Sequence, residues 1–171
     1  MISMREINKI IVHHTGSEKL GGFDNPILIK LRHKYIKGFD DIGYHYLIGN
    51  GILTRDGKVY EGRNIKETGA HASGYNDNSI GIALIGNFEK GEPSERQWQG
   101  LVKLISRNCR IFQIPVKWNY SSIYGHNELE GTDTKCPGKF VDMNKLRRDV
   151  LEYMAMEDAR IAKILNEEVF L

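Results

Sequence analysis

The 171-residue sequence has few cysteines, little net charge and no long apolar run, and each shortage excludes a class of protein. Two cysteines are too few for the disulfide framework that stabilises small secreted domains. A formal net charge of +2 gives no dense basic face, so we expect no nucleic-acid partner. No apolar run approaches the length that spans a bilayer, so we expect no stable membrane insertion. We expect a monomer.

The first residues, MISMREINKIIVHH, do not have the pattern of a secretion signal. Their apolar run is short, and no small-residue cleavage site follows it. We therefore expect no signal peptide and a chain that is cytoplasmic when synthesised.

Length and composition fit a single globular domain. Charged residues make up 27% of the chain and hydrophobic residues 40%, which are ordinary values. A domain of this size buries roughly 70% of the surface that its unfolded chain exposes, so a substantial core is possible. We expect one domain over residues 1–150 and a C-terminal helical extension over residues 151–171 that packs on the same domain. A partner-binding helix is the alternative for the extension.

Short β-branched runs alternate with segments of helical periodicity. Strands are expected at residues 9–14, 44–49 and 79–86. A hairpin is expected at residues 52–63, with a two-residue turn in which Asp56 and Gly57 both adopt positive φ. Helices are expected after three N-terminal caps, namely Asn25 followed by Pro26, Ser94 paired with Gln97, and Asp142. This order predicts an α/β fold, a single domain with a central mixed β-sheet flanked by helices.

Three separate segments each offer a candidate metal ligand. His13 and His14 end an apolar strand, and only one of these neighbours can face a given site because strand side chains alternate. His126 follows another expected strand end, and Cys136 lies ten residues later in a loop rich in Gly, Thr and Asp. By contrast, His33 lies between charged residues of an expected helix, which favours a solvated surface position.

Zinc accounts for these three side chains better than packing does. The ion binds imidazole nitrogen and thiolate sulfur tetrahedrally, and catalytic sites use three protein ligands and leave one position open. A structural site would require a fourth ligand, but no second cysteine or histidine lies near Cys136 in the chain. The other cysteine, Cys109, lies on an apolar helical stripe and is expected to be a small core residue.

Six segments in order resemble one family of enzymes. They are IIVHHTGS, IGYHYLI, DGKVYEGR, GAHASGYNDNSIGIALIGNF, PSERQ and GHNELEGTDTKCPGKF. Their spacing is similar to that of the zinc-dependent N-acetylmuramoyl-L-alanine amidases of the second amidase family. This family includes phage lysozyme-type amidases and peptidoglycan recognition proteins. The resemblance covers about residues 8–148.

The resemblance implies a ligand set and a reaction. By this likeness His13, His126 and Cys136 bind one Zn²⁺, and Tyr44 is a catalytic residue that hydrogen-bonds water at the metal or the developing oxyanion. The implied reaction is hydrolysis of the amide bond between N-acetylmuramic acid and L-alanine in peptidoglycan, because zinc activates water and polarises carbonyls near neutral pH.

Further positions are assigned by the same likeness, with two departures from the family pattern. His71 and Asn76 match a loop that binds substrate. Thr134 stands where phage lysozyme-type members carry a catalytic lysine; its hydroxyl can donate a hydrogen bond to an oxyanion but brings no charge. Ala83 stands where some members carry a glutamate base. The general base is therefore not identified by the sequence.

Two classes of function remain open at this stage. The favoured one is an amidase that acts in endolysin-like lysis, reaching the cell wall after release from a phage- or prophage-carrying cell. The alternative is a non-catalytic peptidoglycan-binding or regulatory module on the same scaffold. Non-catalytic relatives commonly lose the cysteine ligand, whereas this chain keeps Cys136.

Overall fold

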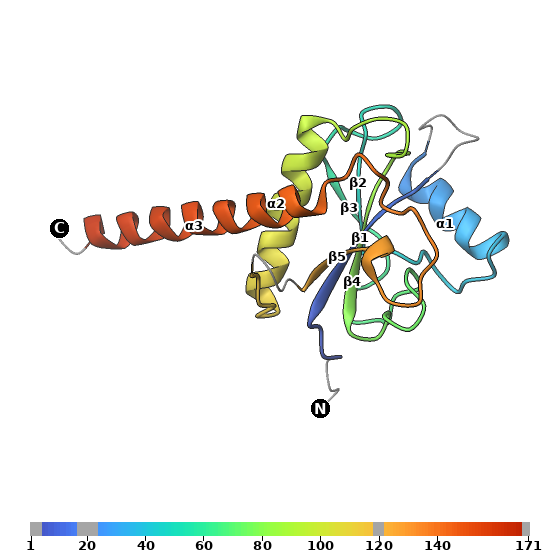
Figure 1. Cartoon of the computed structure of the whole chain (residues 1–171), viewed down its shortest axis with the longest axis horizontal. Helices are drawn as coiled ribbons and strands as arrows, with labels where there is room; N and C mark the ends of the chain where they lie inside the picture. The colour runs from blue at the N-terminus through green and yellow to red at the C-terminus, as the bar shows by residue number, and fades with distance from the viewer. Residues whose placement is uncertain (1–4, 17–23, 118–121, 169–171) are drawn as a thin grey trace.

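A computed structural model describes residues 5–16, 24–117 and 122–168 of the chain. It contains one five-stranded sheet with the order β3-β2-β4-β1-β5 (Figure 1). The strands are β1 (Lys9–His14), β2 (Tyr46–Ile48), β3 (Val59–Glu61), β4 (Ser79–Leu84) and β5 (Ile123–Gly125). Strand β3 runs antiparallel to β2, and the other neighbouring pairs are parallel. The predicted mixed sheet is thereby confirmed.

The two central strands, β1 and β4, carry the most deeply buried segment of the sheet. Every residue of β4 is buried, as expected for a strand that is covered on both faces. The parallel register places His13 opposite Ala83. Since β5 also pairs with β1 in parallel, the carboxyl ends of β1 and β5 open at the same edge of the sheet.

Three helices flank the sheet, and their caps form as the sequence predicts. Helix α1 (Pro26–Tyr35) begins after Asn25, whose side chain accepts a hydrogen bond from the Leu28 N–H. Helix α2 (Glu95–Ile111) begins with the predicted capping box of Ser94 and Gln97. Helix α3 (Met143–Glu168) follows Asp142, whose carboxylate accepts from backbone N–H groups of the first turn.

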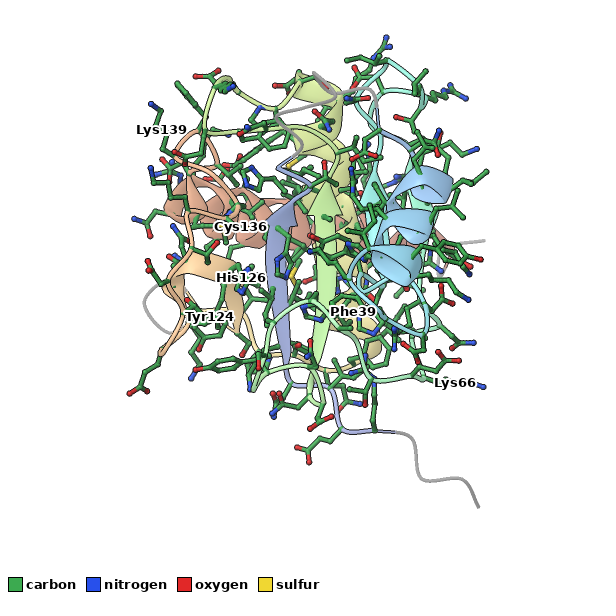
Figure 2. The ribbon with its side chains drawn as sticks, turned by 90° about the vertical axis from the view of Figure 1, so that its right-hand side faces the viewer. Phe39, Lys66, Tyr124, His126, Cys136 and Lys139 are labelled. Carbon is green, nitrogen blue, oxygen red and sulfur yellow. The ribbon has the colours of Figure 1, made fainter. Side chains whose placement is uncertain are left out.

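The helices divide between the two faces of the sheet. Ile10 and Val12 of β1 pack in one cluster with residues of α2 and α3, whereas Ile11 belongs to a separate cluster on the other face. Helix α1 contributes Ile29 to a cluster with Leu47 of β2. Seen from the α1 side, the sheet stands in front of α2 and α3 (Figure 2).

Helix α3 is continuous across residue 150. Its first half packs on α2 through buried Leu146 and Val150, and Arg110 reaches Asp158 at 2.8 Å. Residues 159–165 are exposed, and α3 extends away from the rest of the fold (Figure 1). The boundary between residues 150 and 151 stays a prediction. Within the described residues, no helix combines the length and apolar character required to cross a membrane.

The hairpin prediction was wrong in its turn. Residues 52–55 form no strand, and the antiparallel pair is made by β2 and β3, joined by residues 49–58. Gly57 has φ +71°, but Asp56 does not adopt positive φ. The Asp56 carboxylate instead accepts a hydrogen bond from the Ser94 hydroxyl at 2.6 Å, so the N-terminal end of α2 fixes this loop.

Candidate metal centre

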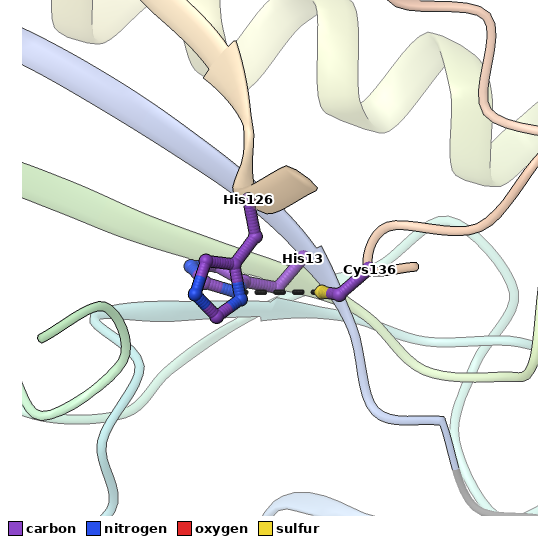
Figure 3. Close-up of side chains that lie close together, drawn as sticks. All are labelled: His13, His126 and Cys136. Atoms are coloured by element: carbon purple, nitrogen blue, oxygen red, sulfur yellow. Dashed lines mark hydrogen bonds between the residues drawn. The ribbon is translucent and has the colours of Figure 1, made fainter. Parts of the chain in front are cut away.

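The structure brings His13, His126 and Cys136 together at the edge of the sheet (Figure 3). His13 is the fifth residue of β1, His126 begins a short 3₁₀ turn directly after β5, and Cys136 lies in the following loop. One donor atom from each residue lies within 4.8 Å of the other two. Within the described part of the chain, these three residues form the only such group of His, Cys, Asp or Glu.

The distance between the Cys136 and His13 donors fits a tetrahedral zinc ion. The Cys136 Sγ lies 3.5 Å from the His13 Nδ1. Zinc bonds of about 2.0–2.1 Å to nitrogen and about 2.3 Å to sulfur give a tetrahedral edge of about 3.6 Å between these ligand types. Both His126 and Cys136 are partly exposed, whereas His13 is buried. Three ligands and one solvent-facing side match the requirement for an open site.

The protonation states of the histidines suit metal binding. Burial, followed by the nearby His71 and His126, lowers the pKa of His13 well below its usual 6.5. Burial also lowers the pKa of His126. Both imidazoles are therefore neutral near pH 7, which is the form that binds a metal.

Cys136 is a thiol until a cation binds. Burial raises its pKa to about 12, and a hydrogen bond from the His14 backbone N–H, 3.4 Å from Sγ, acts in the opposite direction. Because the thiolate is the metal ligand, binding of a cation here displaces the thiol proton. Metal affinity is consequently expected to rise with pH.

Backbone contacts hold the loop that carries Cys136. The Thr134 Oγ1 accepts a hydrogen bond from the Cys136 N–H at 3.2 Å, and the Cys136 carbonyl accepts from the Asn127 N–H at 2.7 Å. The Cys136-Pro137 peptide bond is cis. Gly138 has φ +102°, and a side chain there would collide with the Phe88 carbonyl. The Cys136 loop therefore contacts the segment of Asn127 on one side and the segment of Phe88 on the other.

Tyr44 lies beside the donor cluster. Its ring centroid is 5.3 Å from that of His13 and 5.4 Å from that of His33. Burial raises the pKa of Tyr44, and the nearby Cys136 acts in the same direction. The phenol keeps its proton at neutral pH and can act as a hydrogen-bond donor.

The loop predicted to bind substrate is closely connected to the donor cluster. The His71 Nδ1 lies 3.1 Å from the His13 Nε2. The Asn76 Oδ1 accepts hydrogen bonds from the N–H groups of His71 and Ala72, both at 2.9 Å. The carbonyl end of the Asn76 side chain is thus occupied by its own loop, and a substrate role for either residue stays a prediction.

The remaining histidines show where sequence reasoning succeeded and failed. The side chain of His14 accepts from the Phe88 N–H and turns away from His13, as the alternation of strand side chains predicts, and His45 is buried. The prediction that His33 is solvated was wrong, because it is 4% exposed and its Nδ1 accepts from the Gly43 N–H at 2.9 Å. Its spacing of four residues from buried Ile29 was the signal that it shares the inner face of α1.

The sequence matches a known family of proteins. Residues 3–139 match the family described as N-acetylmuramoyl-L-alanine amidase. The chain is 36% identical over 151 residues to a peptidoglycan-recognition protein of Drosophila simulans, a match that covers 85% of this chain and 75% of that protein.

Solved structures show the same similarity in three dimensions. The endolysin N-acetylmuramoyl-L-alanine amidase LysCS from Clostridium intestinale URNW superposes with a TM-score of 0.72 at 27% identity, covering 85% of this chain and 84% of that chain. The complex of peptidoglycan recognition proteins LCa and LCx bound to tracheal cytotoxin gives a TM-score of 0.65 at 34% identity, covering 81% and 80%.

Proposed function

The chain belongs to the N-acetylmuramoyl-L-alanine amidase family, and on this basis we propose that it is a zinc-dependent hydrolase of peptidoglycan. The bond cleaved is the amide between the lactyl group of N-acetylmuramic acid and L-alanine. The observation that carries this proposal is the complete donor set of His13, His126 and Cys136 within 4.8 Å of one another, with the His13–Cys136 pair at 3.5 Å and two of the three residues partly exposed. A domain that only binds peptidoglycan has no need of an open metal site.

Zinc, when bound at these donors, would polarise the scissile carbonyl and lower the pKa of water near it. The chain's own contribution begins with Tyr44, whose protonated phenol is 5.3 Å, centroid to centroid, from the His13 ring. We assign this hydroxyl to hydrogen bonding with the oxyanion that develops on the carbonyl oxygen. Thr134 brings a second hydroxyl to the Cys136 loop, and its oxygen already accepts from the Cys136 N–H, which leaves its proton available.

Ala83 supplies no base to the site. It lies opposite His13 in the parallel register of β1 and β4, and its methyl group cannot accept a proton. Proton transfer must therefore use other groups of the site. The substrate contacts that the resemblance implies for His71 and Asn76 stay a prediction, and the hydrogen bonds that both residues already make favour a positioning role instead.

We propose endolysin-like lysis of the cell wall as the biological role. The similarity to LysCS, which is an endolysin and an amidase, supports this proposal. The partner is then the muramyl peptide of peptidoglycan. The similarity to the peptidoglycan-recognition protein of Drosophila simulans instead supports the second candidate, a domain that binds peptidoglycan without cleaving it.

A direct assay separates the two candidates. Purified zinc-loaded protein is incubated with a muramyl tripeptide, and mass spectrometry measures the free peptide that begins with L-alanine. The Cys136→Ser variant is the matched control, and zinc content is measured for both proteins. We expect one zinc per chain and peptide release by the wild type only. Zinc uptake with tight ligand binding but no peptide release would favour the recognition function.

A further inference from the structure

We propose that His71 is a positioning residue for the metal centre, which orients the His13 imidazole through a hydrogen bond. The inference rests on the proposed zinc site. His13 presents its two ring nitrogens to different partners: Nδ1 lies 3.5 Å from the Cys136 Sγ, and Nε2 lies 3.1 Å from the His71 Nδ1. The His13 ring therefore lies between Cys136 and His71.

The tautomer of His13 follows from this arrangement. A neutral imidazole has one N–H donor and one acceptor nitrogen, so a ring that binds a cation through Nδ1 carries its proton on Nε2. The Nε2–H then donates to the His71 Nδ1, which acts as the acceptor. Partners of this kind fix the orientation and tautomer of metal-binding histidines in many zinc sites.

Two glycines hold the His71 ring in place. A Cβ atom added at Gly69 would lie 2.5 Å from the His71 Cδ2, and one added at Gly81 would lie 2.4 Å from the same atom. Both contacts are shorter than a side chain allows, so the ring fits only because residues 69 and 81 lack side chains. Gly81 belongs to the central strand β4, in which every residue is buried.

The backbone of His71 is fixed as well. Asn76 accepts hydrogen bonds from the N–H groups of His71 and the following residue, both at 2.9 Å. Asn76 therefore holds the loop, the loop and its glycine neighbours hold His71, and His71 orients His13. This sequence of contacts gives Asn76 an effect on the metal site without contact with substrate.

The surroundings of His71 argue against a direct contact between its ring nitrogens and substrate. Its Nδ1 is used by His13, and its Nε2 is buried without a hydrogen-bond partner in the described structure. One nitrogen is thus engaged by His13 and the other is buried. A substrate contact through Nδ1 would require the His13 hydrogen bond to break, and one through Nε2 would require a movement that uncovers this buried atom.

The test compares two substitutions of similar shape, one with a polar amide and one without polar atoms. In His71→Asn the amide oxygen takes the place of Nδ1 and can accept from His13, whereas His71→Leu has a similar size and no acceptor. Zinc affinity is measured by competition with a chromogenic chelator, and peptide release gives kcat and KM. We expect zinc affinity to fall by about 10–100-fold in His71→Leu and to recover in large part in His71→Asn.

Two further variants keep the test independent of folding. Gly81→Ala keeps His71 but displaces its ring, and it should also weaken zinc binding. Cys109→Ala removes a buried side chain of α2 that does not belong to the donor cluster, so it should lower stability and leave zinc affinity unchanged. Equal zinc affinity of wild type and His71→Leu, with a raised KM, would overturn the proposal in favour of substrate contact.

The zinc measurement also separates this inference from the proposed reaction. A wild type that binds zinc but releases no peptide would refute the amidase proposal, while the difference between His71→Leu and His71→Asn would still test the positioning role. If the wild type, His71→Leu and His71→Asn all bind zinc with equal affinity, the positioning role is refuted, even if the enzyme is active.

Discussion

The Cys136 Sγ lies 3.5 Å from the His13 Nδ1, although 123 positions separate the two residues in the chain. This distance is the tetrahedral edge expected for zinc bound by one sulfur and one nitrogen, about 3.6 Å. The edge of the sheet thus places these two donors at the spacing that a zinc ion requires.

The first prediction concerns Cys136. Because Cys136→Ser replaces the thiolate by a poorly acidic hydroxyl, zinc affinity should fall by more than the ~10–100-fold that is typical of outer-sphere partners. Elemental analysis and peptide release should both decrease to background, while far-UV circular dichroism stays unchanged. Full activity of this variant would disprove the ligand assignment.

The second prediction concerns the Tyr44 hydroxyl. Tyr44→Phe keeps the ring beside His13 and removes one hydrogen-bond donor, so zinc affinity should not change. Loss of an oxyanion donor typically lowers kcat by about 10²–10³-fold. Steady-state kinetics of peptide release, with KM and zinc content measured in parallel, provide the check. A change in zinc content instead of kcat would assign Tyr44 to the packing of His13.

The third prediction concerns the loop contact of Thr134. Thr134→Val removes the acceptor for the Cys136 N–H, and loss of such a hydrogen bond costs about 1 kcal/mol. Urea unfolding should show this loss, and Thr134→Ser should restore stability because its hydroxyl is retained. If Thr134→Ser is as destabilised as Thr134→Val, the methyl group and not the hydrogen bond holds the loop.

The fourth prediction concerns acid stability of the zinc-free protein. Burial lowers the folded-state pKa of His33 and of His45 to about 4, against 6.5 for an ordinary histidine. For His33 the neighbouring cations act in the same direction; for His45 the Glu67 carbonyl opposes the shift and Arg5 adds to it.

The sign of the effect follows from proton linkage. Between pH 6.5 and 4 the unfolded chain binds more protons than the folded one, so the stabilisation is complete above pH 6.5 and is lost as the pH falls. Each residue contributes up to about 3 kcal/mol of this change. Urea unfolding between about pH 7.5 and about pH 4.5 measures it, and His45→Gln should flatten the curve. A wild-type curve without slope in this range would contradict the assignment.

The fifth prediction concerns the exposed half of α3. A chain that ends at Asp158 keeps the contact with Arg110. Of the residues that it loses, positions 159–165 are exposed. Its melting temperature, zinc content and peptide release should match those of the full chain. Leu146→Ala is the positive control, because loss of this fully buried side chain should cost about 2–5 kcal/mol.

Local patterns accounted for much of the fold. The strand at Lys9–His14, the cap at Asn25 and the capping box at Ser94 depend on neighbouring residues, and all three formed as predicted. The turn predicted at Asp56 did not form, because the Asp56 carboxylate accepts a hydrogen bond from the hydroxyl of Ser94, which is distant in the sequence. Sequence spacing cannot show such competition between local and tertiary hydrogen bonds.

In the candidate site, too, the sequence predicted some features and not others. Its three candidate metal donors were predicted by residue type and by resemblance, because zinc chemistry restricts the choice of ligands, and the structure brings them together. The bond between His13 and His71 was not predicted, since it depends on the pairing of strands and on the absence of side chains at Gly69 and Gly81. The burial of His33 also depends on tertiary packing, and its charged neighbours concealed it.

The exposed C-terminal part of α3 is a suitable place to label or immobilise the protein. At 1.5 Å per residue, positions 159–168 extend about 15 Å, on the side of the molecule away from α1 (Figure 1). A dye or a surface linker at Ala162 would therefore be held clear of the sheet edge that carries the candidate metal site. Immobilised beads prepared in this way should keep that edge open to large, insoluble fragments of cell wall.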